Sequence, residues 1–285
     1  MLRKLEEANF DQYVEFAYAL ALDTRKSGYP TYTDGIKTRK DFIERSRKAL
    51  ERDNEEILLY ESSGKVRGWI HYYYLAEDRY LDTCSFCVQE GMGEAIAEFT
   101  AFAREHFPGS ELYLGFPKEN TEAVAAMEAL GFEQIESSWN NAADLEQYRL
   151  APESEDIRLI TRETFPIFAA LHQQCDGEMF WDSEHILADL DGWHIFVKLK
   201  GETATGAIYN RVFADKRMEE IFGVDFPDGV YDGDTYRALV TAVMNDDKRR
   251  GVRHLVLFAD DESQADTLRC GFRCVGAYVC YKLML

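Results

Sequence analysis

The chain repeats its own pattern once, and this repeat constrains the fold more than any other feature of the sequence. In each half, a glycine–phenylalanine pair closes a helical pattern and opens a strand pattern, and single glycines mark two earlier turns. These landmarks recur in the same order at an offset of 138 to 140 residues: Gly131-Phe132 and Gly271-Phe272, Gly93 and Gly233, and Gly68 and Gly206. Internal repetition of this kind predicts two copies of one domain.

Length and composition agree with two globular domains. The chain has 285 residues, and its hydrophobic content of 46% with 13% aromatic residues is sufficient for packed cores. No apolar run reaches the ~18 residues of a membrane-spanning helix. The first residues turn acidic and lack the apolar segment of a signal peptide. We therefore expect a cytoplasmic protein whose six cysteines are reduced thiols.

The formal net charge of −20 limits the partners that the protein can bind. Nucleic-acid-binding proteins present a basic face to phosphates, so we expect neither DNA nor RNA as a partner. The lack of a long apolar run leads us to expect no membrane as a partner either. An acidic surface attracts a cationic substrate such as an amine. The same charge is also explained by solubility alone, and the sequence leaves both interpretations open.

Apolar periodicity predicts the same order of elements in both halves: helix, helix, three strands, helix, strand, helix, strand. In the first half, we expect helices at 9–22, 38–52, 94–106 and 121–130, and strands at 57–61, 67–75, 83–88, 112–116 and from 132 onward. In the second half, we expect helices at 164–175, 183–190, 234–250 and 262–269, and strands at 194–200, 205–213, 220–226, 255–258 and 273–282. The polar stretch 152–156 is the best candidate for a linker, which predicts domains over residues 1–150 and 151–285.

The first half is longer than the second between its first two expected helices. The additional residues fall within 26–35, where Gly28, Pro30, Asp34 and Gly35 indicate a loop. Long loops inside compact domains are often functional. A loop that covers a substrate and a mobile surface excursion are both compatible with this composition.

This order of elements, with a glycine turn before the third helix and Gly-Phe before the last strand, resembles a domain of the GNAT superfamily of N-acetyltransferases. The resemblance covers both halves and therefore nearly the whole chain. It implies an α/β fold of the mixed-sheet α+β type, with two tandem GNAT-like acyl-CoA N-acyltransferase domains. In that family, acyl-coenzyme A lies between two splayed strands, and its pyrophosphate contacts the turn that opens the third helix. Free backbone N–H groups and the helix dipole favour an anion at such a turn.

The matching turn in the first half spans residues 88–93 and keeps both family glycines. Val88 stands where the family usually has Arg or Gln, unless Gln89 takes that role. The carboxylates of Glu90 and Glu94 would repel phosphate, and a plain strand-to-helix turn is the alternative interpretation. The resemblance implies these cofactor-binding residues: Cys87, Val88, Gln89, Gly91, Met92, Gly93, Glu94 and Asn120.

The equivalent turn in the second half, residues 228–233, retains only its final glycine. Tyr231 replaces the first glycine, and three aspartates surround the turn: Asp228, Asp232 and Asp234. Like-charge repulsion weakens the binding of phosphate at such a turn. We therefore predict that the second half is a degenerate domain that is structural or forms part of an acceptor site.

The segment from Asn120 to Phe132 matches the last helix of the family, and Asn120 is expected to cap that helix or to contact the cofactor. Met127 stands at the position of the family's tyrosine general acid, and Thr267 is the equivalent residue in the second half. A methionine cannot donate a proton.

A general base must take the proton of the amine directly or through water. The candidate catalytic residues are Asp82 as this base, with Tyr73 and His71 as groups that could hold a water. A solvated strand-end aspartate and packed aromatic rings are the structural alternatives.

Other patterns do not indicate further chemistry. Cys84 and Cys87 form a Cys-x-x-Cys, but residues three apart in an extended strand point to opposite faces, and no second pair has zinc spacing. We expect no metal. The basic run 248–250 suits the C-terminus of a helix.

The leading hypothesis is transfer of an acetyl or other acyl group from acetyl-CoA, or another acyl-CoA, to an amine of a small molecule or peptide within residues 1–150. Backbone N–H groups near Val88 would polarise the thioester carbonyl. The loop 27–35 would cover the acceptor, and the second half would close or wall that site. The alternative is a non-catalytic acyl-CoA-binding or interaction protein that retains only the fold.

Overall fold

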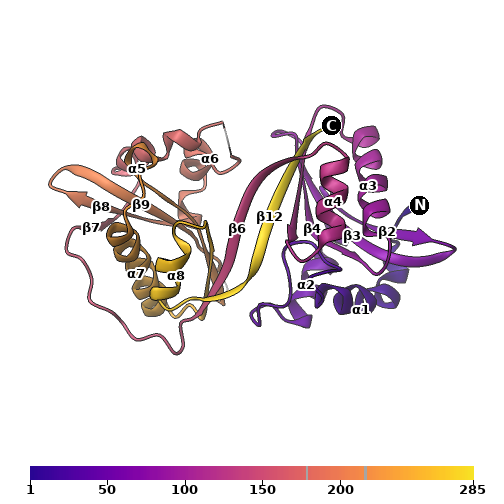
Figure 1. The fold of residues 1–285 in the computed structure, drawn as a ribbon, viewed down its shortest axis with the longest axis horizontal. Coiled ribbons are helices and arrows are strands. Elements are labelled where there is room, and N and C mark those ends of the chain that lie inside the picture. The colour runs from indigo at the N-terminus through magenta and orange to yellow at the C-terminus, as the bar shows by residue number, and fades with distance from the viewer. Residues whose placement is uncertain (178, 215–216) are drawn as a thin grey trace. The chain divides into compact units, whose positions relative to one another are not determined.

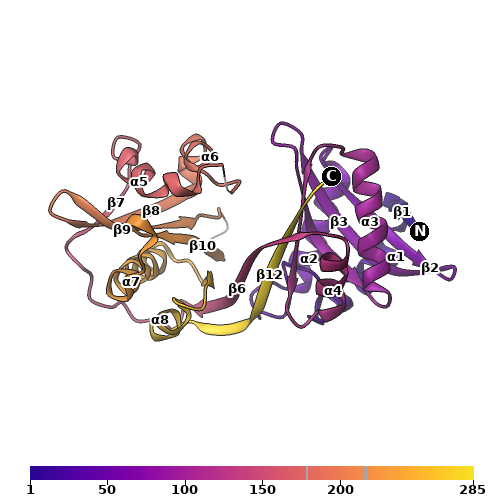
Figure 2. The ribbon, with the colours of Figure 1, turned by 45° about the horizontal axis from the view of Figure 1, so that its top comes forward.

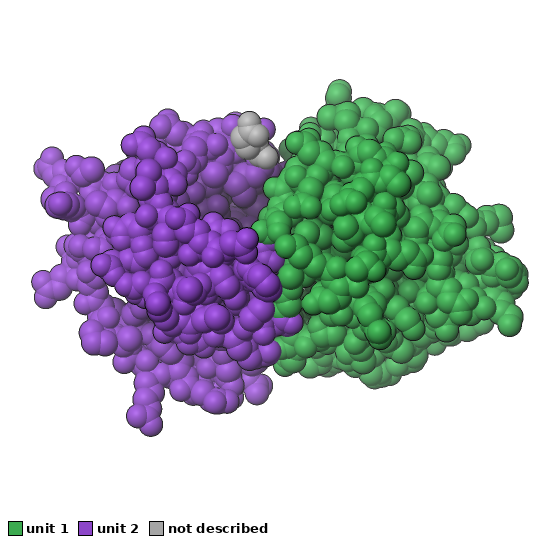
Figure 3. Space-filling model, in the orientation of Figure 1, with its two compact units in different colours: residues 1–137, 276–285 green, residues 138–275 purple. Residues whose placement is uncertain are grey.

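The computed structural model describes residues 1–177, 179–214 and 217–285, and the chain forms two compact units (Figure 3). Unit 1 comprises Met1–Ser137 and Gly276–Leu285, and unit 2 comprises Ser138–Val275. Each unit has a mixed sheet with helices on both faces, so the predicted fold class is confirmed. Among the described residues, no helix combines the length and the apolar character that a membrane crossing requires.

Unit 1 contains the first four helices and a six-stranded sheet. The strands are β1 (Leu2–Lys4), β2 (Glu55–Ser62), β3 (Lys65–Leu75), β4 (Tyr80–Val88), β5 (Glu111–Pro117) and the later part of β12 (Arg273–Met284), in the order β1-β2-β3-β4-β5-β12. The helices are α1 (Phe10–Ala21), α2 (Arg39–Lys48), α3 (Met92–His106) and α4 (Thr121–Ala129). Strands β4 and β5 are parallel, and the other neighbours are antiparallel.

Unit 2 repeats this arrangement. Its strands are β7 (Ile157–Leu159), β8 (Trp193–Lys200), β9 (Thr203–Arg211), β10 (Met218–Asp225), β11 (His254–Ala259) and the later part of β6 (Glu133–Asp144), in the order β6-β11-β10-β9-β8-β7. The helices are α5 (Phe165–His172), α6 (Ser183–Ala188), α7 (Gly233–Arg250) and α8 (Gln264–Arg269). The sequence did not predict β1 and β7, which have only three residues each.

Strands β6 and β12 each continue from one unit into the other. Residues 139–144 of β6 pair with β11 in unit 2, whereas residues 278–284 of β12 pair with β5 in unit 1. The last strand of each sheet therefore comes from the other half of the sequence. The compact units divide within these two strands, and the polar stretch 152–156, expected to be a linker, belongs to unit 2.

Two helical layers cover opposite faces of the sheet in unit 1, as Figures 1 and 2 show. Helices α3 and α4 pack on one face, with Phe86, Phe99 and Phe116 in the core, and α1 and α2 pack on the other around Phe42 and Trp69. In unit 2, α7 packs on one face and α5 and α6 pack on the other. Burial of these apolar side chains is the main favourable term in folding.

Candidate active site

The parallel strands β4 and β5 separate soon after they begin. Their pairing joins Tyr80 with Glu111 and Leu81 with Leu112, near the first residues of both strands. Further along, a β-bulge at Cys84 shifts the register between β3 and β4. A bulge bends the strand that carries it. Beyond Leu81 and Leu112, these two fully described strands do not pair with each other, and the gap between them is called the β4–β5 groove below.

An extended segment of the chain's own backbone lies in this groove, along β4. The N–H of Val88 donates to the carbonyl of Lys26 at 2.8 Å, and the N–H of Gly28 donates to the carbonyl of Phe86 at 2.7 Å. These are the bonds of an antiparallel strand pair. Residues 26–29 are named the strap below.

The strap is also attached to β5 and to α4. The N–H of Tyr29 donates to the carbonyl of Gly115 at 2.8 Å. The side chain of Asn120 donates to the carbonyl of Ser27 at 3.3 Å, and its oxygen accepts the N–H of Ala123 at 3.2 Å. Asn120 thus caps α4, which is one of the two roles expected for it from the sequence. The mobile-excursion interpretation is wrong for the strap, because Ser27 is only 1% exposed.

Gly28 lets the strap approach both strands closely. A Cβ at this position would lie 3.0 Å from the carbonyl oxygen of Gly115 and 3.2 Å from the Cβ of Phe86. Both distances are shorter than ordinary van der Waals contacts, so a side chain here requires the strap or its neighbours to shift.

Carboxylates surround the N-terminus of α3, where the sequence predicted a phosphate. Gly91 is the N-cap with a φ of 75°, which requires glycine or a strained residue. The N–H of Gly93 donates to Oε1 of Glu122 at 3.0 Å, and the side chains of Glu90 and Glu94 are exposed nearby. A phosphate would therefore have to displace the Glu122 carboxylate from this N–H.

The structure brings the predicted residues Tyr73 and Asp82 together. The hydroxyls of Tyr73 and Tyr80 donate to Oδ2 of Asp82 at 3.3 and 3.1 Å, and the N–H of Thr83 donates to Oδ1 at 2.6 Å. Burial raises the pKa of Asp82 to about 6, although these three hydrogen bonds lower it. Asp82 is therefore largely ionised at neutral pH, and its pKa is close to that of an effective general base.

His71 lies in a separate buried network. Its Nε2 contacts Oε2 of Glu55 at 2.9 Å, and the guanidinium groups of Arg45 and Arg52 bind the same carboxylate. Burial lowers the pKa of His71. Glu55, His71 and Cys84 lie close enough to share a metal ion, but the two guanidinium groups already neutralise Glu55. This set fits an ion-pair network better than a metal site.

Cys84 and Cys87 are on the same face of the sheet, so the expectation of opposite faces is wrong. Nη2 of Arg45 donates to Sγ of Cys84 at 2.9 Å, and Cys87 lies in the core around Trp69 under α1 and α2. Cys84 is itself the extra residue of the bulge, and this interrupts the regular alternation of side chains along β4. Both are free thiols, and burial raises the pKa of each to about 12.

The equivalent turn of unit 2 is also occupied by a carboxylate. The side chain of Asp232 accepts the N–H groups of Asp234 and Thr235 at 2.9 and 3.0 Å and so caps α7. The hydroxyl of Tyr231 donates to Asp266 at 2.8 Å. The first N–H groups of α7 are therefore already bound.

Neither position of the expected general acid faces a groove. Met127 is fully buried in the core under α3 and α4. Thr267 is equally buried, and its hydroxyl lies 2.5 Å from that of Tyr236. Both residues have a structural role in packing.

Sequence reasoning missed Tyr80 and Glu122, and it expected the loop that contains the strap to cover the acceptor rather than to lie between β4 and β5. Tyr80 could have been found, because it alternates with Asp82 on one face of the strand. The partners of Glu122 and of the strap are distant in sequence, so no local pattern indicates them.

The chain has the fold of the GNAT N-acetyltransferases, in a tandem arrangement, and this confirms the resemblance seen in the sequence. One similar structure is a GCN5-related N-acetyltransferase from Sphaerobacter thermophilus, with a TM-score of 0.64 and 16% identity over 100% of this chain and 95% of that one. Another is a tandem GNAT protein from the clavulanic acid biosynthesis pathway, with a TM-score of 0.57 and 14% identity over 100% and 98%. A third, from Kribbella flavida, has a TM-score of 0.53 and 14% identity over 84% and 93%. The sequence matches no protein-family profile and no curated protein.

Proposed function

We propose that this chain transfers an acyl group from acyl-CoA to an amine in the groove between β4 and β5. The observation that supports this most is that backbone groups on both sides of the groove bind an extended chain, the strap. The pantetheine arm of coenzyme A is also an extended chain with amide groups. It can therefore replace the strap and use the same backbone partners.

In this proposal, two groups of the protein act on the reaction. The N–H of Val88, which now donates to the strap, polarises the thioester carbonyl once the strap has left. Asp82 accepts the proton of the amine, directly or through a water held by Tyr73, while the new C–N bond forms and the C–S bond breaks. Met127 donates no proton, but a thiol with a pKa of ~8.5 can leave as its thiolate.

The negative charge of the protein determines which substrates are favoured. A cationic amine is attracted by the net charge of −20, whereas the diphosphate of coenzyme A is repelled. Glu122 must also release the N–H of Gly93 before a phosphate can bind there. We therefore expect weak binding of acyl-CoA in unit 1. The capped N-terminus of α7 supports a structural role for residues 151–285.

Calorimetric titration of the intact chain with acetyl-CoA tests this function. The variant Gly28→Ala should bind more tightly than the wild type, because the added Cβ crowds Gly115 and Phe86 and weakens the attachment of the strap to the groove. Gly276→Ala is the matched control, since the nearest atom to a Cβ there lies 3.9 Å away. A chromatographic assay for free coenzyme A, with a polyamine as the acceptor, measures turnover.

Two results would overturn the proposal. If neither the wild type nor Gly28→Ala binds acetyl-CoA, the chain has retained the fold without the cofactor, which is the alternative function. The satisfied backbone groups and the acidic α3 N-terminus are the observations in favour of that alternative. If binding survives Gly91→Glu, which adds a carboxylate beside α3, the site has been placed in the wrong part of the fold.

A further inference from the structure

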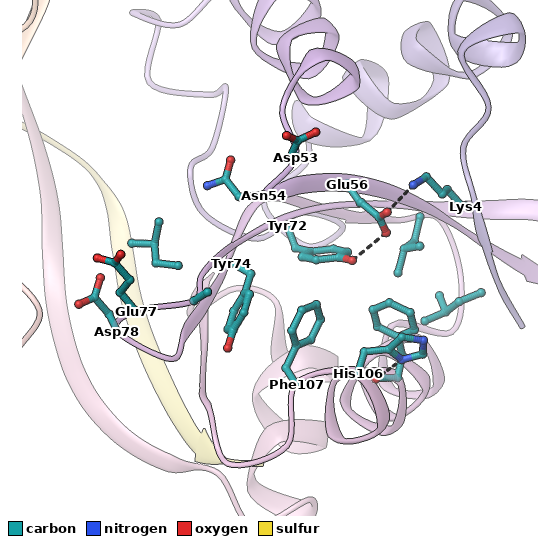
Figure 4. Close-up of a pocket in the computed structure, with 15 residues that line it drawn as sticks. Lys4, Asp53, Asn54, Glu56, Tyr72, Tyr74, Glu77, Asp78, His106 and Phe107 are labelled. Atoms are coloured by element: carbon teal, nitrogen blue, oxygen red, sulfur yellow. Dashed lines mark hydrogen bonds and ion pairs between the residues drawn. The ribbon is translucent and has the colours of Figure 1, made fainter.

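Unit 1 has a cavity on the opposite face of the sheet from Asp82. Its volume is ≈ 880 Å³, and it lies between β1, the start of β2, the end of β3 and the C-terminal turn of α3 (Figure 4). Tyr72 and Tyr74 of β3 line it, whereas Tyr73 between them contacts Asp82. Because alternate strand residues point to opposite faces, this cavity cannot present a molecule to the β4–β5 groove.

Aromatic rings form the walls of the cavity. The ring centroids of Tyr74 and Phe107 are 4.6 Å apart, those of Tyr72 and Phe107 5.8 Å, and those of Tyr72 and Phe102 5.9 Å. These contacts hold the rings in place without a ligand. Figure 4 shows Tyr72, Tyr74 and Phe107 around one open space.

The rim of the cavity is acidic. Four carboxylates line it: Asp53, Glu56, Glu77 and Asp78. Among the lining residues, all of which the structure describes, the only lysine or arginine is Lys4, and its ammonium group is already paired with Glu56. The hydroxyl of Tyr72 also donates to Glu56 at 2.9 Å. With His106 counted as neutral, the formal charge of the lining side chains is therefore negative.

We propose that this cavity binds an organic ammonium ion that carries an apolar group. Aromatic faces attract a cation through their quadrupoles and bury the apolar part of the ligand. The carboxylates at the rim add long-range attraction, and they exclude phosphates and other anions. The site is independent of acyl transfer, because it lies on the other face of the sheet.

The test uses benzyltrimethylammonium as the probe and the intact chain as the receptor, with binding followed by NMR or calorimetry. Neopentylbenzene, which has the same shape without the charge, is the matched neutral ligand. The cation should bind more tightly than the neutral molecule, and its binding should weaken when salt is added. Tyr74→Leu should raise the Kd about threefold or more, and Tyr74→Phe, which keeps the ring, should not.

Variants of the rim separate the charge from the fold. Asp53→Asn and Glu77→Gln change exposed side chains and should each raise the Kd about twofold to threefold. Glu7→Gln, an exposed carboxylate outside the cavity, is the control and should leave the Kd unchanged. Equal affinity for the cation and the neutral molecule would overturn the proposal. So would the absence of binding, or binding that none of these variants weakens, or occlusion of the cavity by a second copy of the chain.

Discussion

The pKa of Asp82 leads to a prediction about the stability of the fold. Folding raises this pKa from 3.8 to about 6, so the folded protein holds the proton more tightly than the unfolded chain. A shift of ~2 pKa units corresponds to about 3 kcal/mol. Because the folded pKa is raised, stability is present at low pH and is lost as the pH rises from about 4 through about 6. Replacement by asparagine, which does not ionise, removes this loss.

The free energy of unfolding of Asp82→Asn should therefore rise relative to the wild type by ~2 kcal/mol between about pH 4.5 and pH 7.5. Urea denaturation of both proteins at several pH values measures the difference in their free energies of unfolding. The contributions of the other titrating groups are the same in both proteins and cancel in this difference. Asp53→Asn, the same substitution at an exposed carboxylate, is the control for the general effect of losing one negative charge. A flat or falling difference for Asp82→Asn would refute the argument that burial dominates its pKa. In the acyl-transfer assay, the same variant should lose about 10²- to 10⁴-fold in rate if Asp82 is the base.

Three further predictions concern other parts of the two units. Glu122→Gln should tighten the binding of coenzyme A several-fold in calorimetry, because it removes a negative charge from the N–H of Gly93; unchanged binding would place the phosphate elsewhere. Gly91→Ala should lower the free energy of unfolding by about 1 to 2 kcal/mol in urea denaturation, because its φ is 75°. Burial lowers the pKa of His172, but the hydrogen bond with Asp225 and further partners raise it to about 10. The stability from this pair is present below about pH 6.5 and is lost as the pH rises through about 10, so Asp225→Asn should lower the imidazole pKa in an NMR titration. An unchanged imidazole pKa would contradict this account.

Local patterns in the sequence predicted most of the fold. Apolar residues at helical or alternating spacing located α3 and β3 within two residues of their ends, because such stripes are properties of the segment itself. The three-residue strands β1 and β7 were missed because they are too short to show a period. The continuation of β6 and β12 between the units was also missed. Each of these strands follows a Gly-Phe pair, so the two look alike in the sequence. The alternation of apolar residues in a strand does not indicate which strand it pairs with.

The sequence indicated only the part of the candidate site in which the residues are directly opposite each other on adjacent strands. Tyr73 and Asp82 face each other across β3 and β4, so their strand positions were sufficient. His71 lies two residues earlier on the same strand, yet Glu55 and Arg45 draw it into an ion network that the sequence does not indicate. Contacts between distant segments, such as Glu122 with Gly93, depend on tertiary packing.

The strap determines what a measured affinity for acyl-CoA would mean. An empty groove would leave buried backbone groups of Phe86, Val88 and Gly115 without partners, at a cost of about 1 to 3 kcal/mol each. The strap supplies those partners through three hydrogen bonds, each with a net value of about 1 kcal/mol. A ligand that displaces the strap must first break these three hydrogen bonds, so its binding free energy is reduced by their total of about 3 kcal/mol. The strap therefore lowers the affinity for the ligand by up to about 10²-fold. The ratio of affinities between Gly28→Ala and the wild type therefore gives a lower bound on the free energy of the strap. A ratio of one would mean that the strap and the ligand do not compete for the same groove.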